Sequence, residues 1–257
     1  MDQVGLATLL SQPKPVKEEE SGLSPLWYGN VVTTAQTTPS AYIKQAPPEE
    51  ILSEAVCAIA GRALGLPIPK PYLVYDEHGY VTSSEDERLL AMEDARMPPV
   101  NWLVQEHDDD ALIEELFNWP GRYQTAAWDE WVANEDRNMG NLLFGKGGFT
   151  LIDHGRALGA HPPGSPVPHV TESRTNVVAW IISQIERDTG DARSRKKAKE
   201  LVPYLEGLDF ETLAESVEAE EYGMVSRLSE VIDFLQQRIT PLPRLVGNHH
   251  RQAEMPL

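Results

Sequence analysis

The side chains best suited to chemistry lie in one stretch of the chain, residues 134–155. Within it, apolar residues flank Gly145-Lys146-Gly147-Gly148, and this spacing predicts a β-hairpin with a glycine-rich turn. One strand starts just after Asn141 and the other ends just before Asp153. Because a hairpin brings its two ends together, we expect Asn141 and Asp153 to be neighbours, with Asp136 a few residues upstream.

One amide and two carboxylates gathered at a loop edge are the oxygen ligands that Mg²⁺ prefers, and Mg²⁺ also keeps phosphates in its coordination shell. Asp136, five positions before Asn141, lies close without being forced into that shell, so it could accept a proton from an attacking hydroxyl. This arrangement is typical of phosphoryl transfer. Asp and Asn also cap turns frequently, but the full spaced set with Asp153 favours a site.

The composition excludes several classes of protein. The 257 residues carry 40 Asp and Glu against 22 Lys and Arg, a formal net charge of −18, which disfavours nonspecific binding to duplex nucleic acid or anionic lipid. The single cysteine, Cys57, excludes an internal disulfide and a cysteine-rich zinc site. No stretch approaches 18 apolar residues and the N-terminus lacks a signal pattern, so we expect a soluble, cytoplasmic protein.

The chain divides into four parts by composition and periodicity. Residues 1–25 carry prolines, an acidic run and few large apolar groups, so they are predicted to form a disordered N-terminal tail. Residues 26–95 predict a small lobe of strands with one helix, and residues 96–240 predict a larger helical lobe with the loop of interest. Residues 241–257 are expected to form a flexible C-terminal tail. The predicted fold class is α+β.

The local patterns place the elements of both lobes. In the small lobe, β-branched and aromatic residues predict strands at 31–34, 41–44, 72–75 and 88–92, and a helix buried on more than one face is expected at 49–64. In the large lobe, apolar periodicity predicts helices at 111–119, 127–133, 176–187, 210–219 and 224–239. The proline- and glycine-rich residues 157–170 are expected to form an exposed loop.

Asp136-Arg137 followed by Asn141, a hairpin and Asp153-His154-Gly155 resembles the motif of the protein-kinase-like superfamily. The pattern looks most like the HipA-like kinases and is also similar to the phosphatidylinositol 3- and 4-kinases. The resemblance covers residues 27–240, and it implies a two-lobed protein-kinase-like fold that binds ATP and Mg²⁺ between a small, mostly β N-lobe and a helical C-lobe.

Roles follow from the resemblance residue by residue. Asp136 becomes the catalytic base, and Asn141 and Asp153 become the Mg²⁺ ligands. Lys44 becomes the cation on the α and β phosphates, since the other lysines upstream of the motif lie in the tail or in a proline-bound connection. Glu54, on the helix at 49–64, is expected to pair with Lys44. The adenine is expected against the connection near residues 90–99.

Three positions depart from the family pattern. Asn138 stands where both families often have histidine, and His154 replaces the usual phenylalanine. The expected phosphate-covering loop lacks glycines and offers hydroxyls instead, among them Thr37 and Thr38. Hydroxyls and backbone amides contact phosphate, but a loop without glycine approaches it less closely.

The resemblance to HipA-like toxins implies a serine/threonine kinase that phosphorylates a protein hydroxyl, and it implies a toxin–antitoxin setting. ATP and a protein acceptor or partner are the expected partners, with neither direct nucleic-acid binding nor membrane binding. Two alternatives stay open. One is a kinase of a small molecule or lipid headgroup. The other is a pseudokinase that acts as a nucleotide- or partner-binding module, which the absent glycines and Asn138 favour.

Overall fold

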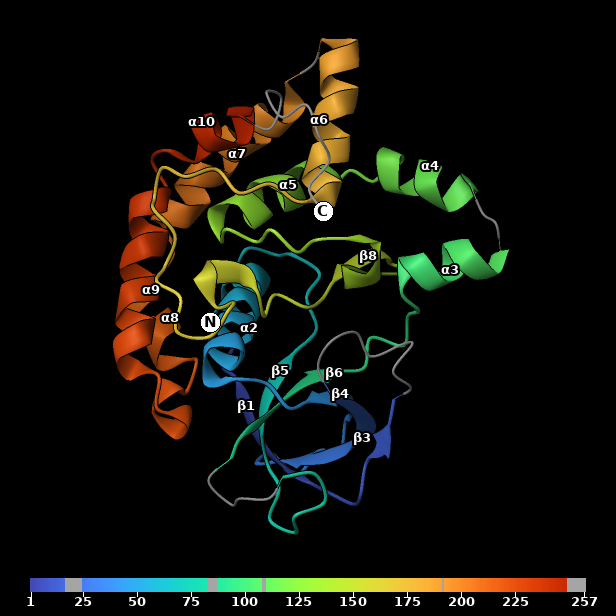
Figure 1. Cartoon of the computed structure of the whole chain (residues 1–257), viewed down its shortest axis with the longest axis vertical. Helices are drawn as coiled ribbons and strands as arrows, with labels where there is room; N and C mark the ends of the chain where they lie inside the picture. The colour runs from blue at the N-terminus through green and yellow to red at the C-terminus, as the bar shows by residue number, and fades with distance from the viewer. Residues whose placement is uncertain (17–24, 83–86, 108–109, 191, 249–257) are drawn as a thin grey trace.

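A computed structural model describes residues 1–16, 25–82, 87–107, 110–190 and 192–248. It is a mixed α/β structure with a strand-rich N-terminal part and a helical C-terminal part, which is consistent with two lobes (Figure 1). The expected α+β organisation is confirmed at this level. Within the described ranges, none of the helices is long and apolar enough to cross a membrane.

The strand-rich part is one six-stranded sheet that curves back on itself. Its strand order is β1-β5-β6-β4-β3-β2, and β1 pairs with β3 as well as with β5. Ala7, Val31, Ile43 and Val74, all buried, belong to the apolar cluster of this curved sheet. The strands are β1 Gly5–Leu9, β2 Lys14–Pro15, β3 Leu26–Thr33, β4 Ser40–Lys44, β5 Pro71–Tyr75 and β6 Leu89–Glu93.

Helix α2, Pro48–Ala63, lies between the sheet and the C-terminal helices (Figure 1). Proline stands in its first turn, where the missing N–H costs no hydrogen bond, and Glu49 and Glu50 favour the positive end of the helix dipole. Every residue from 50 to 61 is buried, which confirms a helix covered on more than one face. The helix therefore presents its polar residues to the interior, where they find partners in the functional site.

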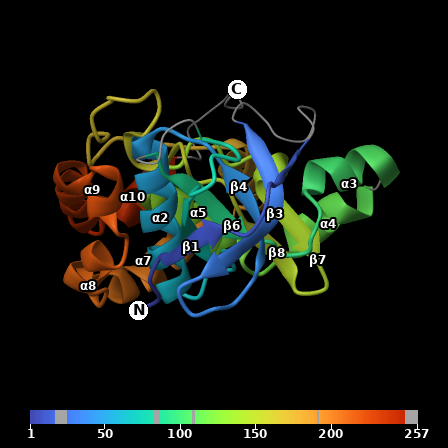
Figure 2. The ribbon, with the colours of Figure 1, turned by 90° about the horizontal axis from the view of Figure 1, so that it is seen from below.

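Eight α-helices make up most of the described C-terminal part, and each of the five helices that the periodicity predicts overlaps one of them. Seen from the strand side, α8 and α9 lie beside α2, and α3 lies on the opposite flank (Figure 2). The buried rings of Trp128 and Trp131 contact each other in a tilted arrangement, with centroids 5.4 Å apart and an interplanar angle of 54°. The helices are α3 Val100–His107, α4 Asp110–Asn118, α5 Arg122–Trp131, α6 Val177–Thr189, α7 Arg193–Glu206, α8 Phe210–Glu215, α9 Val225–Arg238 and α10 Leu242–Asn248.

Both segments predicted as tails contain regular structure among their described residues. Within the N-terminal tail predicted at 1–25, β1 pairs in parallel with β5 and antiparallel with β3, and β2 pairs with β3. Residues 17–24 of that tail lie outside the described residues. Within the C-terminal tail predicted at 241–257, residues 242–248 form α10, and residues 249–257 lie outside the described residues. Both segments gain their order from pairing and burial against distant parts of the chain, which local composition does not report.

Leu245 tests whether α10 is part of the folded core, because its side chain is fully buried. We expect Leu245→Ala to lower the free energy of unfolding by about 2–5 kcal/mol, through lost burial and a residual cavity. Val225→Ala, at a side chain that is 52% exposed on α9, is the control and should change it by less than about 0.5 kcal/mol. Urea unfolding followed by circular dichroism measures both. Equal curves for the two variants would show that α10 adds nothing to the core.

Candidate active site at the Asp136 loop and hairpin

The predicted hairpin forms and brings the two ends of the motif together. Strands β7, Leu142–Gly145, and β8, Gly148–Leu151, pair antiparallel with Leu142 opposite Leu151. Beyond the last pair, the backbone N–H of Ile152 donates to the carbonyl of Asn141 at 3.2 Å. Asn141, just before β7, and Asp153, just after β8, therefore lie next to each other at the base of the hairpin.

Asp136 is joined to Asn141 directly. The Asn141 Nδ2 atom donates to the Asp136 carbonyl at 2.8 Å and lies 3.5 Å from the carboxylate Oδ2. Asn138 shapes the turn between them: its Oδ1 accepts from the Gly140 N–H at 2.7 Å, and its Nδ2 donates to the Asp136 carbonyl at 3.0 Å. The residue that departs from the family pattern thus serves the loop itself, as the cap of a short 3₁₀ helix, η1, at Met139–Asn141.

Asp153 is held in an unusual backbone conformation. Its φ of +57° lies in the left-handed region, which Asp adopts more readily than most residues but at some cost in energy. Hydrogen bonds on both sides maintain it: the carbonyl of Ile152 accepts from Arg137 at 2.6 Å, and the carbonyl of His154 accepts from Ser53 at 2.7 Å. The carboxylate remains 39% exposed and so is available to a ligand.

Lys44, at the end of β4, reaches this carboxylate from the sheet. Its Nζ atom lies 3.1 Å from Asp153 Oδ1 and 4.0 Å from Glu50 Oε2. Burial opposes the charge of the amine, but the carboxylates of Asp153, Glu54 and Glu50 outweigh that effect, so the pKa of Lys44 is raised. The amine is therefore a fixed positive charge beside the predicted metal ligands.

The ion pair predicted between Lys44 and Glu54 is taken by Glu50. Only three residues separate Lys44 from the start of α2, so the first turn of the helix, with Glu50, lies closest to the amine. Glu54 stands one turn further on and places its Oε2 atom 3.7 Å from His154 Nδ1. The charge of Glu54 helps to raise the pKa of Lys44, but its carboxylate lies against the buried ring of His154.

Arg137 belongs to the motif, but the sequence analysis assigned it no role. It is fully buried, and its guanidinium donates to the carbonyls of Asn141 at 2.8 Å and Ile152 at 2.6 Å. The same group pairs with Asp129 of α5 at 3.2 Å and contacts His154 Nε2 at 2.8 Å. In the sequence, the indication of such a buried cation was the acidic pair Asp129-Glu130, which lies between two tryptophans of a buried helix and requires a partner.

His154 fills the position of the usual phenylalanine as a neutral, buried ring. Burial, and then the charge of Arg137, lowers its pKa to about 3. Because a guanidinium only donates, Nε2 accepts from Arg137 and the ring proton sits on Nδ1, facing Glu54. Neither His154 Nδ1 nor Glu54 Oε2 has a hydrogen-bond partner among the described residues. His154 thus contacts both Arg137 and Glu54 of α2.

Two opposing effects act on the pKa of Asp136. Burial raises the pKa of its carboxyl above the ordinary value, and the nearby charge of Arg156 opposes that rise. The Arg156 Nη1 atom lies 3.5 Å from Asp136 Oδ1, and both side chains are about one-third exposed. The carboxylate therefore sits at the surface of the site, where a hydroxyl can reach it.

The register of the sheet places the turn with Thr37 and Thr38 away from Lys44, and their contact with phosphate stays a prediction. In the β3–β4 pair, Asn30 lies opposite Ser40 and Leu26 lies opposite Lys44. The turn with the two threonines precedes Ser40, so it lies at the end of β4 away from Lys44, roughly 13 Å off at about 3.3 Å per residue. Thr37 is instead tied to Thr33, with hydroxyl oxygens 2.8 Å apart.

The connection expected to contact adenine runs from β6 along the hairpin. The N–H of Phe144 donates to the carbonyl of Pro98 at 3.0 Å, and Pro99 forms an isolated bridge with Leu143. Met97 lies against the hairpin, where a Cβ on Gly145 would meet its side chain at 2.8 Å. The connection is therefore fixed beside the strand that follows Asn141. Its contact with adenine stays a prediction.

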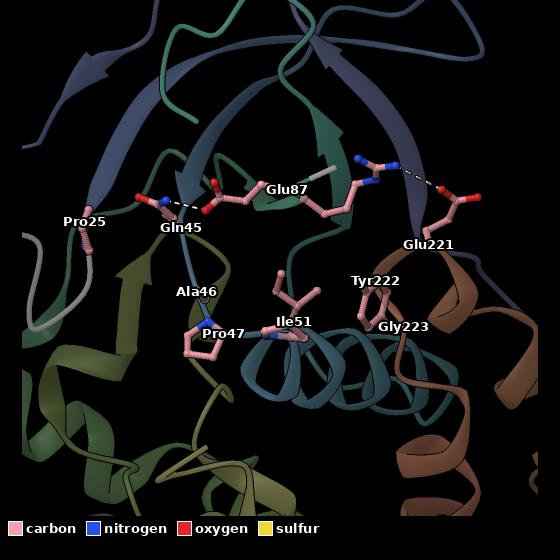
Figure 3. Close-up of a pocket in the computed structure, with 11 residues that line it drawn as sticks. Pro25, Gln45, Ala46, Pro47, Ile51, Glu87, Glu221, Tyr222 and Gly223 are labelled. Carbon is pink, nitrogen blue, oxygen red and sulfur yellow. Dashed lines mark hydrogen bonds and ion pairs between the residues drawn. The ribbon is translucent and has the colours of Figure 1, made fainter. Parts of the chain in front are cut away.

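A cavity of about 630 Å³ lies next to the site and is distinct from it (Figure 3). It opens below the sheet and is lined by the connection from β4 to α2, including Gln45 and Pro47, and by Glu221 and Tyr222 of the 3₁₀ helix η3, Ala219–Tyr222. Neither Lys44 nor the three oxygen-bearing side chains of the loop and hairpin are among its described lining residues. The cavity therefore does not define the predicted nucleotide position.

The donor set fits Mg²⁺. Asn141 uses its nitrogen on Asp136, which leaves its side-chain oxygen for a cation, and Asp153 keeps an exposed carboxylate. In the described part of the chain, no cluster of three or more His, Cys, Asp or Glu side chains could hold a metal by itself. Mg²⁺ commonly binds through one or two side chains and completes its shell with phosphates and water, so a site of one amide and one carboxylate suits it.

Comparisons with known proteins assign this chain to no family. No protein-family model matches the sequence, and no curated protein sequence matches it. Solved structures similar to it include the crystal structure of a Helicobacter pylori proinflammatory kinase, CtkA. That similarity has a TM-score of 0.49 and 12% sequence identity, and it covers 95% of this chain and 97% of that chain.

Arg137 provides a test of the framework of the site. We expect Arg137→Ala to lower the free energy of unfolding by about 3–5 kcal/mol, because it leaves the Asp129 carboxylate charged and without its buried partner. Arg174→Ala removes partly exposed ion pairs with Glu135 and Glu172 and is the control, with an expected loss of at most about 1 kcal/mol. Guanidinium unfolding measures both. A loss for Arg137→Ala no larger than that of the control would contradict this role.

Proposed function

We propose that this protein is an ATP- and Mg²⁺-dependent phosphotransferase with a kinase-like, two-lobed fold. One observation carries the proposal: the loop at Asp136, the two ends of the hairpin and the end of β4 converge, so that Lys44 lies 3.1 Å from Asp153 while Asn141 contacts Asp136. A cation, a pair of oxygen ligands and a separate carboxylate in one place suit the binding of a triphosphate and the positioning of its acceptor.

Different parts of the Mg²⁺–nucleotide complex are bound by Lys44 and by the two ligand residues. Lys44 contacts the α and β phosphates, and Glu50 holds its amine in place from the first turn of α2. Asn141 and Asp153 would hold Mg²⁺, which when bound neutralises charge on the β and γ phosphates. The left-handed backbone at Asp153 aims its carboxylate toward Lys44, and the hydrogen bonds on either side keep it there.

Asp136 supplies the proton chemistry. Its carboxylate orients the acceptor hydroxyl and takes its proton as the oxygen attacks the γ phosphorus. The new oxygen–phosphorus bond forms while the bond to the β–γ bridging oxygen breaks, and ADP leaves with that electron pair. The contact with Asn141 holds the carboxylate next to the ligand residues.

We propose a serine or threonine hydroxyl of a protein as the acceptor, as in the HipA-like kinases that the motif resembles. Asp136 is 30% exposed, so a protein side chain can reach it from outside. The net charge of −18 opposes approach to an anionic membrane and so disfavours a lipid headgroup. A soluble small-molecule acceptor remains an outcome that the following experiment detects.

Asp136→Ala is the direct test of the catalytic role. In an assay with labelled ATP and Mg²⁺, phosphate transfer to protein, or release from ATP, should fall by about 10²–10⁴-fold, since a positioned base contributes that much. Glu135→Ala removes the adjacent carboxylate, which is 52% exposed and paired with Arg174, and should leave the rate within about threefold. Mass spectrometry of the products identifies the acceptor.

The same assay separates catalysis from binding alone. A pseudokinase would be stabilised by ATP in a thermal-melting experiment, yet it would release and transfer no phosphate. If the unmodified protein turns over ATP and Asp136→Ala keeps its rate within a few fold, the assignment of the base is wrong.

Lys44 gives a prediction for nucleotide affinity. We expect Lys44→Ala to weaken binding of Mg²⁺–ATP about 10- to 100-fold, because a charge-assisted contact to phosphate is lost. Lys196→Ala, at a side chain that is 78% exposed on α7, is the control and should bind as the unmodified protein does. Isothermal titration calorimetry measures both constants, and equal affinities would remove Lys44 from the nucleotide site.

A further inference from the structure

Arg156 is a second cation of the site, beside Asp136. It follows Asp153-His154-Gly155 directly, and its Nη1 atom lies 3.5 Å from Asp136 Oδ1. A charge-assisted N–H···O bond measures about 2.7–2.9 Å, so this ion pair is loose. The guanidinium is 32% exposed and can exchange Asp136 for a stronger anion without leaving a buried charge unpaired.

The backbone of Arg156 is fixed although its side chain is not. The Ser53 hydroxyl contacts the carbonyls of His154 at 2.7 Å and Ala157 at 3.0 Å, one on each side of Arg156. Ala157 is fully buried and donates its N–H to the His154 carbonyl at 3.0 Å. The backbone at Arg156 is therefore held against α2, the helix that also positions Glu50 beside Lys44.

The other cations of the site are committed elsewhere. Arg137 is fully buried and directs its guanidinium to Asp129, to two backbone carbonyls and to His154. Lys44 pairs with Asp153 and Glu50. Within the described part of the chain, Arg156 is the cation that forms an ion pair with Asp136, the carboxylate expected beside the acceptor hydroxyl.

We propose that Arg156 is a catalytic residue that binds the phosphoryl group during its transfer. This inference rests on the proposed function. The transferring group carries charge on three equatorial oxygens, and a planar guanidinium donates to two of them at once. In the nucleotide-free protein, Arg156 pairs with Asp136. When the γ phosphate arrives, the guanidinium turns to it and frees the carboxylate to accept the hydroxyl proton.

The variants Arg156→Ala and Arg156→Gln test this proposal, the second because it keeps much of the side-chain stem. We expect kcat to fall by about 10³-fold or more, the effect typical of an arginine on the transferring group. Binding of Mg²⁺–ADP should stay within about threefold, because ADP lacks the γ phosphate. Arg195→Ala, which removes an exposed cation from α7, is the control and should leave kcat unchanged.

A second readout does not depend on turnover. Aluminium fluoride with Mg²⁺–ADP mimics the phosphoryl group in transfer, and it should raise the melting temperature of the unmodified protein above that with Mg²⁺–ADP alone. Both Arg156 variants should lose this increment and keep the shift with Mg²⁺–ADP. Variants with kcat within fivefold and the full increment would overturn the role of Arg156.

The two proposals fail in different ways. If the unmodified protein shows no turnover and no increment with aluminium fluoride, the phosphotransferase function falls and the role of Arg156 falls with it. If the unmodified protein turns over ATP, Asp136→Ala abolishes turnover and the Arg156 variants retain it, only the assignment of Arg156 is overturned.

Discussion

The geometry of the site depends on one buried guanidinium, that of Arg137. It joins α5, through Asp129, to the carbonyls at both ends of the hairpin. A buried charge is expensive unless it is paired and fully hydrogen-bonded, and here the pair and the backbone acceptors satisfy it together. This constraint fixes the separation of the hairpin ends, and Asn141 and Asp153 take their positions from those ends.

Helix α2 is the second element that the site requires. Its polar residues face inward in succession: Glu50 lies near Lys44, Ser53 contacts the carbonyls on either side of Arg156, and Glu54 faces His154. A displacement of α2 would therefore move the ion pair of the sheet lysine and the loop after Asp153 at the same time. Helix α8 contacts α2 from the C-terminal part, and α9 lies on the same flank (Figure 2).

The site contains two cations although the chain as a whole is strongly acidic. A protein with a net charge of −18 repels phosphates at long range, yet Lys44 lies beside Asp153 and Arg156 lies beside Asp136. At short range two cations in a partly buried site outweigh a distant, screened surface charge. The same arrangement gives each cation a carboxylate partner before any nucleotide binds, and each must exchange that partner for phosphate.

Local pattern determined much of this protein: the hairpin at 142–151, the buried helix at 49–64 and the proximity of Asn141 to Asp153 all follow from spacing and periodicity over a few residues. Tertiary structure alone decided the rest. Strand β1 and helix α10 are ordered by partners far along the chain, the β3–β4 register separates Thr37 from Lys44, and Glu50 replaces Glu54 because the link to α2 is short. Such choices depend on which groups are brought into contact across the fold, and composition within a window of ten residues contains no record of those contacts.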